Sequence, residues 1–307
     1  MSVLRISILG AGAMGSLFGG LLAEAGHDVE LLDVNPTQIA AVREHGLLIR
    51  NDAGERRLAV PIMRPEEARA QPDWLIVFTK AMHTQGALAA ARHLIGPHTR
   101  LLSLQNGLGN AERLAAFADG SRIAIGMTTV PADLAAPGEV HSHGESRTRV
   151  VMADGSEDAA LDALAAALTG AGLPCAVDPD ASVAIWEKVA FNVALNSLCA
   201  VTRRTVGALG GDAGGRQLAH AVASEVLAVA QAEGLAVSLE RAHATIDHAL
   251  DHHGGHKPSM LQDLLAKRPT EIETLNGAVV RAAGHRGIEV PRTETLHALV
   301  KMAEQAT

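Results

Sequence analysis

Short apolar runs alternate with longer segments of helical periodicity along the first 177 residues of the chain. The strand-like runs lie at residues 3–9, 28–33, 74–79, 100–104, 122–125 and 148–152. Alanine-rich stretches at residues 86–95 and 158–171 have the composition and spacing of helices that would cover a sheet. Strands that alternate with helices in this way predict an α/β fold.

The alternation ends at the Asp-Pro-Asp segment of residues 178–180, and helical patterns fill the rest of the chain. They span residues 181–206, 216–233, 238–252, 259–267, 271–283 and 292–305. The sequence therefore predicts an α/β domain over residues 1–178 and an all-α helical domain over residues 179–307. Residues 131–146, rich in Gly, Pro and His, are expected to form a long loop.

A glycine-rich turn joins the first apolar run to a helical segment. Its sequence is Gly10-Ala11-Gly12-Ala13-Met14-Gly15. Gly10 permits a tight turn, Gly12 lets the backbone approach a pyrophosphate, and Gly15 lets the helix pack closely on the strand. Amides at the helix start, including those of Ala13 and Met14, would receive the phosphates. Because the motif follows a strand and opens a helix, it favours a Rossmann-type dinucleotide site over an ordinary glycine turn.

The second strand-like run ends in a carboxylate, Asp33, which lies 18 positions after Gly15. In dinucleotide-binding folds, an acidic residue about 20 residues after the glycines hydrogen-bonds a ribose hydroxyl. We therefore assign Asp33 to the cofactor site.

Composition narrows the class of protein. The chain has 307 residues, 48% hydrophobic and 20% charged, which is typical of a globular soluble protein with two domains. The net charge of −8 argues against a nucleic-acid or anionic-membrane partner. Cys175 and Cys199 have no metal-type spacing and are interpreted as buried small hydrophobes. With no apolar run of membrane-spanning length and no signal segment, we expect a cytoplasmic protein.

The helix expected at the start of the second domain carries a polar stripe on an apolar background. Lys188, Asn192 and Asn196 are spaced i, i+4 and i+8, so they share one face among Val, Ala, Phe and Leu neighbours. Polar groups in such surroundings are costly. Lys188 could protonate the oxygen that forms when hydride reaches a carbonyl carbon, while the asparagines orient the substrate. The alternative is a solvated helix face with an extended lysine.

Several short motifs accompany the glycine-rich turn and the polar stripe. They are Phe78-Thr79-Lys80-Ala81, Gln105-Asn106-Gly107-Leu108-Gly109-Asn110, Pro137-Gly138-Glu139-Val140, Lys257-Pro258-Ser259-Met260-Leu261-Gln262-Asp263 and Arg268-Pro269-Thr270-Glu271-Ile272. With these motifs the chain resembles the ketopantoate reductase (2-dehydropantoate 2-reductase) family over nearly its whole length. Together they are far more specific than the glycine-rich turn alone.

The resemblance implies reduction of the C2 carbonyl of a small 2-oxo acid, 2-dehydropantoate or a related branched acid, by hydride transfer from a nicotinamide cofactor. Lys188 would be the general acid, and Glu271 a second catalytic or ligand-positioning carboxylate. Asn192, Asn196 and Ser259 would hold the oxygens of the substrate. The expected partner is thus a small molecule, and both a monomer and a homodimer remain open.

The resemblance also places two residues at strand ends, where open α/β sheets bind ligands. Asn106 would lie beside the nicotinamide and the substrate, and Lys80 on the cofactor side. Each has a simpler explanation, because Asn106 and Gly107 form a common turn pair and Lys80 could be a solvated lysine.

Residues of the second domain have structural alternatives of the same kind. Ser259 could lie near a helix N-cap, and Thr270 with Glu273 has the spacing of a capping box. Glu271 would then be an acid near the positive end of a helix dipole.

His252, His253 and His256 invite a metal-site interpretation because His is a common metal ligand. Their setting is a Gly-rich segment without a nearby Cys or a clear helical i, i+4 pair, which favours a solvated loop. His141 and His143, in the expected loop at residues 131–146, are interpreted in the same way. We therefore expect no metal.

Asp33 is the main departure from the family pattern. Ketopantoate reductases commonly use NADPH and carry a basic residue at this position for the 2′-phosphate. A carboxylate instead hydrogen-bonds a ribose hydroxyl and repels a phosphate, and residues 31–41 contain no Lys or Arg. We therefore expect NAD(H) to be favoured, with NADP(H) as the family-typical alternative.

Two other functions remain open. A β-hydroxyacid dehydrogenase has a similar nucleotide motif and a Lys-x-x-x-Asn helix, but it carries glycines just before the lysine, where this chain has residues 180–187 without glycine. A non-catalytic nucleotide-binding regulator would have kept the fold and lost the reaction. The retained Lys188, Asn192, Ser259 and Glu271 favour the enzyme.

Overall fold

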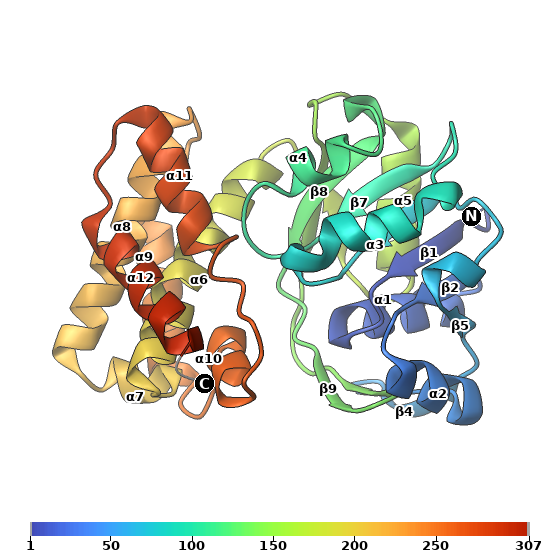
Figure 1. Ribbon diagram of the computed structural model, residues 1–307, viewed down its shortest axis with the longest axis horizontal. Helices are drawn as coiled ribbons and strands as arrows, with labels where there is room; N and C mark the ends of the chain where they lie inside the picture. Colours follow the sequence, from blue (N-terminus) through green and yellow to red (C-terminus); the bar gives the residue numbers. More distant parts are fainter. Residues whose placement is uncertain (1, 306–307) are drawn as a thin grey trace. The chain divides into compact units, whose positions relative to one another are not determined.

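The computed structural model describes residues 2–305, which form two compact units (Figure 1). The first unit comprises the described residues up to Gln105 together with Asn110–Ala181. The second comprises Asn106–Gly109 and the described residues from Ser182 onward. The α/β fold followed by a helical domain, predicted from the sequence, is confirmed.

Within residues 2–305, the first unit holds an eight-stranded and a four-stranded sheet. The larger sheet has the order β12-β11-β8-β7-β6-β1-β2-β5. Its strands are β1 (Arg5–Leu9), β2 (Asp28–Leu32), β5 (Ile62–Met63), β6 (Trp74–Val77), β7 (Arg100–Ser103), β8 (Ile123–Thr128), β11 (Thr148–Met152) and β12 (Cys175–Val177). The neighbouring strands β5, β2, β1, β6, β7 and β8 run parallel to one another, and β11 is antiparallel to β8. This is the strand order of a doubly wound dinucleotide-binding sheet, and each predicted strand is present.

Both faces of this sheet are buried, as its nearly continuous apolar strands require. Ile8 and Trp74 belong to the apolar cluster that includes Phe18 of α1. Leu75 belongs to a separate cluster with Leu88 of α3. The helices of this unit are α1 (Ala13–Glu24), α2 (Pro36–His45), α3 (Thr84–Ala90), α4 (Asn110–Ala115) and α5 (Ala159–Gly170).

The smaller sheet corrects the prediction of a long loop at residues 131–146. That segment forms β9 (Asp133–Ala136) and β10 (Glu139–His141), which join β3 (Leu47–Asn51) and β4 (Gly54–Leu58) in the order β4-β3-β10-β9. This sheet lies against α1. The local composition of Gly, Pro and His predicted a loop. The pairing partner, β3, is distant in the sequence, so no local signal indicated a strand.

The second unit is helical. Its helices are α6 (Ala181–Thr202), α7 (Val206–Gly210), α8 (Ala213–Ala232), α9 (Leu239–His252), α10 (Ser259–Leu265), α11 (Asn276–Arg286) and α12 (Pro291–Gln305). The helix predicted over residues 181–206 ends early, because Arg203 has a left-handed backbone (φ 55°) and the Thr205 side chain caps α7. The helix predicted from residue 271 begins five residues later, at Asn276.

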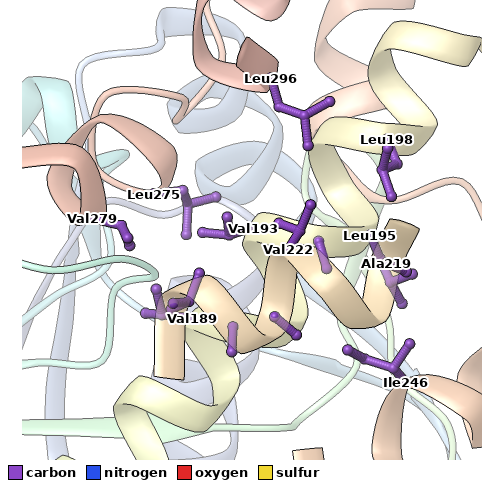
Figure 2. Packing of buried hydrophobic residues seen from close by; sticks show 14 of the residues in the cluster. Val189, Val193, Leu195, Leu198, Ala219, Val222, Ile246, Leu275, Val279 and Leu296 are labelled. Carbon is purple, nitrogen blue, oxygen red and sulfur yellow. The ribbon is translucent and has the colours of Figure 1, made fainter. Parts of the chain in front are cut away.

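The core of this unit forms around the apolar side of α6 (Figure 2). Val193 and Leu195 of α6 are fully buried and belong to one cluster with Val222 of α8 and Ile246 of α9. Val279 of α11 completes this group. Aliphatic side chains thus hold α6 rigidly, which fixes the direction of its polar stripe.

Two expectations from composition can be compared with the structure. Cys199 is completely buried in the helical core and Cys175 is partly buried, and both thiols are free. Burial raises the pKa of each thiol to about 12, which makes both unreactive as thiolates at neutral pH.

No helix in residues 2–305 combines the length and the hydropathy that crossing a membrane requires.

The close contact at the start of α1 gives a stability prediction. A Cβ at Gly15 would lie 1.8 Å from the Gly10 carbonyl oxygen, so Gly15→Ala should lower the free energy of unfolding by about 1–3 kcal/mol. Urea unfolding measures this change. Gly86→Ala is the matched control, because Gly86 lies in α3 with no described atom within 4 Å of its Cβ position. It should be neutral or slightly stabilising, and an equal loss in both variants would contradict the packing argument.

Candidate active site

The glycine-rich turn is shaped by contacts that only glycine permits. Gly10 has a positive φ of 102°, and a Cβ there would lie 2.7 Å from the Thr79 nitrogen. A Cβ at Gly15 would collide with the Gly10 carbonyl. Gly12 has no described atom within 4 Å of its Cβ position, so the turn is open on that side. The three glycines therefore differ in task, two serving close packing and one leaving room for a ligand.

The start of α1 fits an anionic ligand. Its N-cap is Gly12, which provides no side-chain hydrogen bond, and its first turn holds no acidic residue. The amides of Ala13, Met14 and Gly15 thus lie in the first turn, at the positive end of the helix dipole, where phosphates bind well. The donor set and the open side at Gly12 fit the pyrophosphate of a dinucleotide.

Asp33 is fixed beside the turn. The Ala11 amide donates to its Oδ2 atom at 2.6 Å, and the Asn35 amide donates to Oδ1 at 2.8 Å. The Ala11 carbonyl in turn accepts hydrogen bonds from Ser16 Oγ and Gln38 Nε2, both at 2.9 Å. Sequence reasoning did not identify Ser16 and Gln38, whose contribution is to hold this turn.

The ends of β6 and β7 carry the next group of predicted residues. Lys80 is partly buried and directly follows Thr79, the residue that Gly10 approaches. Gln105 is buried, and its Nε2 donates to the Thr79 carbonyl and to Thr84 Oγ1 at 2.8 Å. The two strand ends are therefore linked near the glycine-rich turn by Gln105, a residue whose role was not foreseen.

Asn106 follows β7 in the sequence but groups with the helical unit. The Leu108 amide donates to the Thr274 carbonyl at 2.9 Å. Gly107 has a φ of 86°, and a Cβ there would lie 2.2 Å from the same oxygen. Asn106 and Gly107 thus form a turn, as their simpler explanation expected. This turn is also held against Thr274, which lies three residues after Glu271.

The polar stripe lies on α6 and is not a solvated face. The exposed fractions of Asn192 and Asn196 are 8% and 5%, and Lys188 is partly buried. Desolvation lowers the pKa of Lys188 to about 8, and the nearby Glu271 carboxylate acts in the opposite direction. A lysine with such a pKa can exchange a proton near neutral pH, which an ordinary surface lysine does poorly.

Glu271 is not part of a capping box. It lies in a turn that precedes α11, and its carbonyl accepts from the Thr274 and Leu275 amides. Glu273 instead forms an ion pair with Lys301 at 2.6 Å. The capping box of Thr270 with Glu273 is therefore wrong, since α11 has Leu275 as its N-cap and no side-chain cap. Glu271 lies five residues before the first residue of α11 and not in its first turn, which also removes the helix-dipole alternative.

Ser259 is the first residue of α10. It is exposed, and the N-cap position belongs to Pro258 with no side-chain hydrogen bond. Ser259 therefore lies next to a helix N-cap, as its structural alternative expected, although its side chain is not the cap. Its hydroxyl is accessible at the start of the helix.

Asn276 is a further residue that sequence reasoning missed. It is completely buried at the start of α11, and within residues 2–305 its carboxamide has no hydrogen-bond partner. Buried polar groups are nearly always paired, so this amide marks a position that calls for water or a ligand. The signal in the sequence was an Asn-Gly pair inside an apolar pattern, which is easily taken for a turn.

Of the three histidines expected in a solvated loop, His252 is instead the last residue of α9. His253 and His256 lie in an exposed loop, as predicted. His248 was overlooked, although it forms an i, i+4 pair with His252 on α9, with ring centroids 4.6 Å apart. Across residues 2–305, no three His, Cys, Asp or Glu side chains are arranged to hold a metal ion.

Comparison with known proteins connects this geometry to a family. The family profile "Ketopantoate reductase PanE/ApbA" matches residues 6–155, and "Ketopantoate reductase PanE/ApbA C terminal" matches residues 180–304. The 2-dehydropantoate 2-reductase of Streptococcus pyogenes serotype M3 is 34% identical over 298 residues, covering 95% of this chain and 97% of that protein. The Halobacterium salinarum 2-dehydropantoate 2-reductase is 34% identical over 307 residues, covering 98% and 99%.

Solved structures give the same result. A D-mandelate dehydrogenase with NADH and anilino(oxo)acetate superposes with a TM-score of 0.94 at 31% identity, with 99% of both chains covered. A 2-dehydropantoate 2-reductase from Geobacter metallireducens GS-15 has a TM-score of 0.92 at 32% identity, covering 99% of this chain and 100% of that one. Fold and relatives define an oxidoreductase that uses a nicotinamide cofactor. The chain belongs to the ketopantoate reductase family, as its motifs indicated.

The lowered pKa of Lys188 makes stability depend on pH. Between about 8 and its ordinary value of 10.5, the unfolded chain binds more protons than the folded chain, so the free energy of unfolding rises with pH across this window. Lys188→Met removes the titrating group. The difference between wild type and variant should therefore increase from about pH 8 upward in urea unfolding.

Lys301→Met is the control for this measurement. The Glu273 carboxylate raises the pKa of Lys301, so the contribution of Lys301 is fully present below its ordinary value and should stay constant up to about pH 10. Parallel pH curves for wild type and Lys188→Met would show that Lys188 titrates like a solvated lysine.

Proposed function

We propose that this protein reduces the C2 carbonyl of a small 2-oxo acid to the 2-hydroxy acid with NADH, the substrate being 2-dehydropantoate or a related branched acid. The observation that carries the proposal is Lys188, a desolvated lysine beside Glu271 whose pKa is lowered to about 8. Family membership supports a 2-oxo acid as the substrate class.

In the proposed reaction, the nicotinamide cofactor supplies the hydride that adds to C2. Lys188 donates its proton to the carbonyl oxygen, so that a hydroxyl forms, and its amine is reprotonated from solvent. The ammonium also stabilises negative charge that develops on this oxygen. Glu271 opposes the desolvation of Lys188 and keeps the lysine protonated near neutral pH.

The remaining residues would position the two ligands. Asn192 and Asn196, held on the rigid α6, and Ser259 at the start of α10 would hydrogen-bond the oxygens of the acid, and Asn106 would lie between acid and nicotinamide. The residues proposed to hold the cofactor are Gly10, Gly12, Ala13, Met14, Gly15, Asp33, Lys80 and Asn106.

The preference for NADH rests on Asp33. Its carboxylate is fixed by the Ala11 and Asn35 amides at the end of β2, where the ribose of a bound dinucleotide is expected. A carboxylate accepts a hydrogen bond from a ribose hydroxyl and repels a 2′-phosphate. The similar D-mandelate dehydrogenase structure contains NADH.

A second candidate substrate is a larger, aromatic 2-oxo acid. The observation that favours it is the TM-score of 0.94 with D-mandelate dehydrogenase, together with the acidic Asp33. The chemistry at C2 would be unchanged, and only the side chain of the acid would differ.

Steady-state kinetics test the proposed reaction. Catalytic efficiency should be highest for 2-oxo acids and at least about tenfold higher with NADH than with NADPH, because a like-charge contact at the 2′ position costs more than about 1.4 kcal/mol. The panel comprises 2-dehydropantoate, other branched 2-oxo acids, phenylglyoxylate and, in the reverse direction, 3-hydroxy acids. Oxidation of 3-hydroxy acids alone would favour a β-hydroxyacid dehydrogenase, and tight cofactor binding without turnover would favour a regulator. Higher efficiency with NADPH would refute the cofactor assignment.

Lys188→Ala should reduce turnover by about 10²–10⁴-fold, the usual contribution of a general acid, and should leave the affinity for NADH unchanged. In the wild type, kcat/KM for reduction should fall above about pH 8, because the ammonium loses its proton there. In purified wild-type and variant proteins, NADH fluorescence measures the affinity for the cofactor, and steady-state kinetics across pH measure turnover and kcat/KM. Unchanged turnover in Lys188→Ala would remove the lysine from the mechanism.

Glu271→Gln and Glu273→Gln form a matched pair for the same experiment. Loss of the Glu271 carboxylate removes a charge that raises the pKa of Lys188, so the fall in kcat/KM should begin at lower pH. Glu273 is bound to Lys301 on the surface, and its replacement should leave the pH profile unchanged. Identical profiles in both variants would exclude the proposed role of Glu271.

A further inference from the structure

Asp33 has Arg64 as a neighbour across the sheet, although Arg64 lies 31 positions away in the sequence. β5 runs parallel beside β2, with Leu32 opposite Met63. The Asp33 amide donates to the Met63 carbonyl at 3.0 Å. Asp33 and Arg64 are therefore the first residues beyond two adjacent parallel strands, at the carboxyl edge where such sheets bind ligands.

The backbone of Arg64 is held in place while its side chain is exposed. Its amide donates to Glu67 Oε2 at 3.2 Å, and its carbonyl accepts from the Glu67 amide at 2.9 Å, closing the short 3-10 turn Pro65–Glu67. The Arg64 Nη2 atom lies 3.5 Å from the Val34 carbonyl oxygen. The guanidinium thus reaches over the turn that immediately follows Asp33.

Neighbouring arginines are committed to other partners. The Arg43 guanidinium binds Glu67 at 2.7 Å and the Ile62 carbonyl at 2.8 Å. Arg69 donates to the Glu66 carbonyl at 2.8 Å. Arg64 makes a longer bond to a neutral carbonyl, and its exposed position leaves further N–H donors facing solvent. A planar guanidinium with available donors can bind a phosphate through two parallel hydrogen bonds.

We propose that Arg64 is a specificity-determining residue for the adenosine end of the cofactor, where it attracts the 2′-phosphate that Asp33 repels. The inference rests on the proposed function, because it requires a dinucleotide at the glycine-rich turn. The Asp33 carboxylate already accepts from two backbone amides, which compensate part of its charge. Arg64 adds an exposed positive charge next to the turn that follows Asp33, so the preference for NADH is graded and NADPH still binds.

Binding of nucleotides without substrate tests this proposal. Dissociation constants of NADH and NADPH are measured by cofactor fluorescence, and those of AMP and adenosine 2′,5′-bisphosphate by competition. Arg64→Ala should weaken NADPH and the bisphosphate by about tenfold, since one charge-assisted phosphate contact is lost, and should change NADH and AMP by less than about twofold. Arg64→Lys should restore part of the loss. Arg69→Ala removes an equal charge nearby and should change none of the four constants.

Each outcome has a distinct meaning. If NADH binds normally and Arg64→Ala leaves the NADPH constant unchanged, Arg64 has no role in specificity while the proposed function stands. Equal weakening of all four nucleotides would also overturn the inference, because it would indicate a general adenosine contact. If the wild type binds no nucleotide, the dinucleotide function itself fails. Thermal unfolding midpoints of the exposed-site variants confirm that the comparison is between folded proteins.

Discussion

The dinucleotide half of the molecule depends on one close contact, between Gly15 at the start of α1 and the carbonyl of Gly10. Because no Cβ intervenes, the helix packs directly on the turn that leads out of β1. The Ala11 carbonyl can then accept from Ser16 and Gln38. Gln38 also accepts a hydrogen bond from the amide of Gly138, between β9 and β10 of the smaller sheet, at 2.8 Å. One steric requirement thus organises the turn, its acid and the second sheet.

The helical unit is organised by a different constraint, the cost of burying an ammonium. Lys188 belongs to α6, whose apolar residues pack into an aliphatic core, so the backbone from which the lysine side chain extends is fixed. Desolvation and the Glu271 carboxylate act on its pKa in opposite directions, and desolvation is the larger effect. Burial that would be a defect in a purely structural helix gives this lysine a pKa suited to proton transfer.

Local patterns were sufficient to predict the main sheet, the glycine-rich turn and the polar stripe. Each of these is encoded within a few consecutive residues, by apolar periodicity or glycine spacing. The smaller sheet was missed because β10 pairs with β3 from far away, as at Val140 and Ile49, and no local signal reports this pairing. The proposed role of Arg64 has no local signal either, since a search of residues 31–41 cannot find a charge that follows the adjacent strand β5. The helix predicted from residue 271 begins later because the residues before Asn276 form a turn, in which the Glu271 carbonyl accepts from the Thr274 and Leu275 amides.

The proposed cofactor determinants, Asp33 and Arg64, lie in the first unit, whereas the proposed proton donor and most substrate ligands lie in the second. A change of cofactor preference therefore need not change the acid that is reduced. Asn106 is the exception, because its peptide bond to Gln105 joins two anchored segments. Gln105 is bound to Thr79 and Thr84 at the sheet edge, and Gly107 is fitted against Thr274 beside the Glu271 turn. Asn106 is therefore flanked by anchored residues, so the position proposed for it beside both ligands is fixed by backbone packing rather than by a flexible loop.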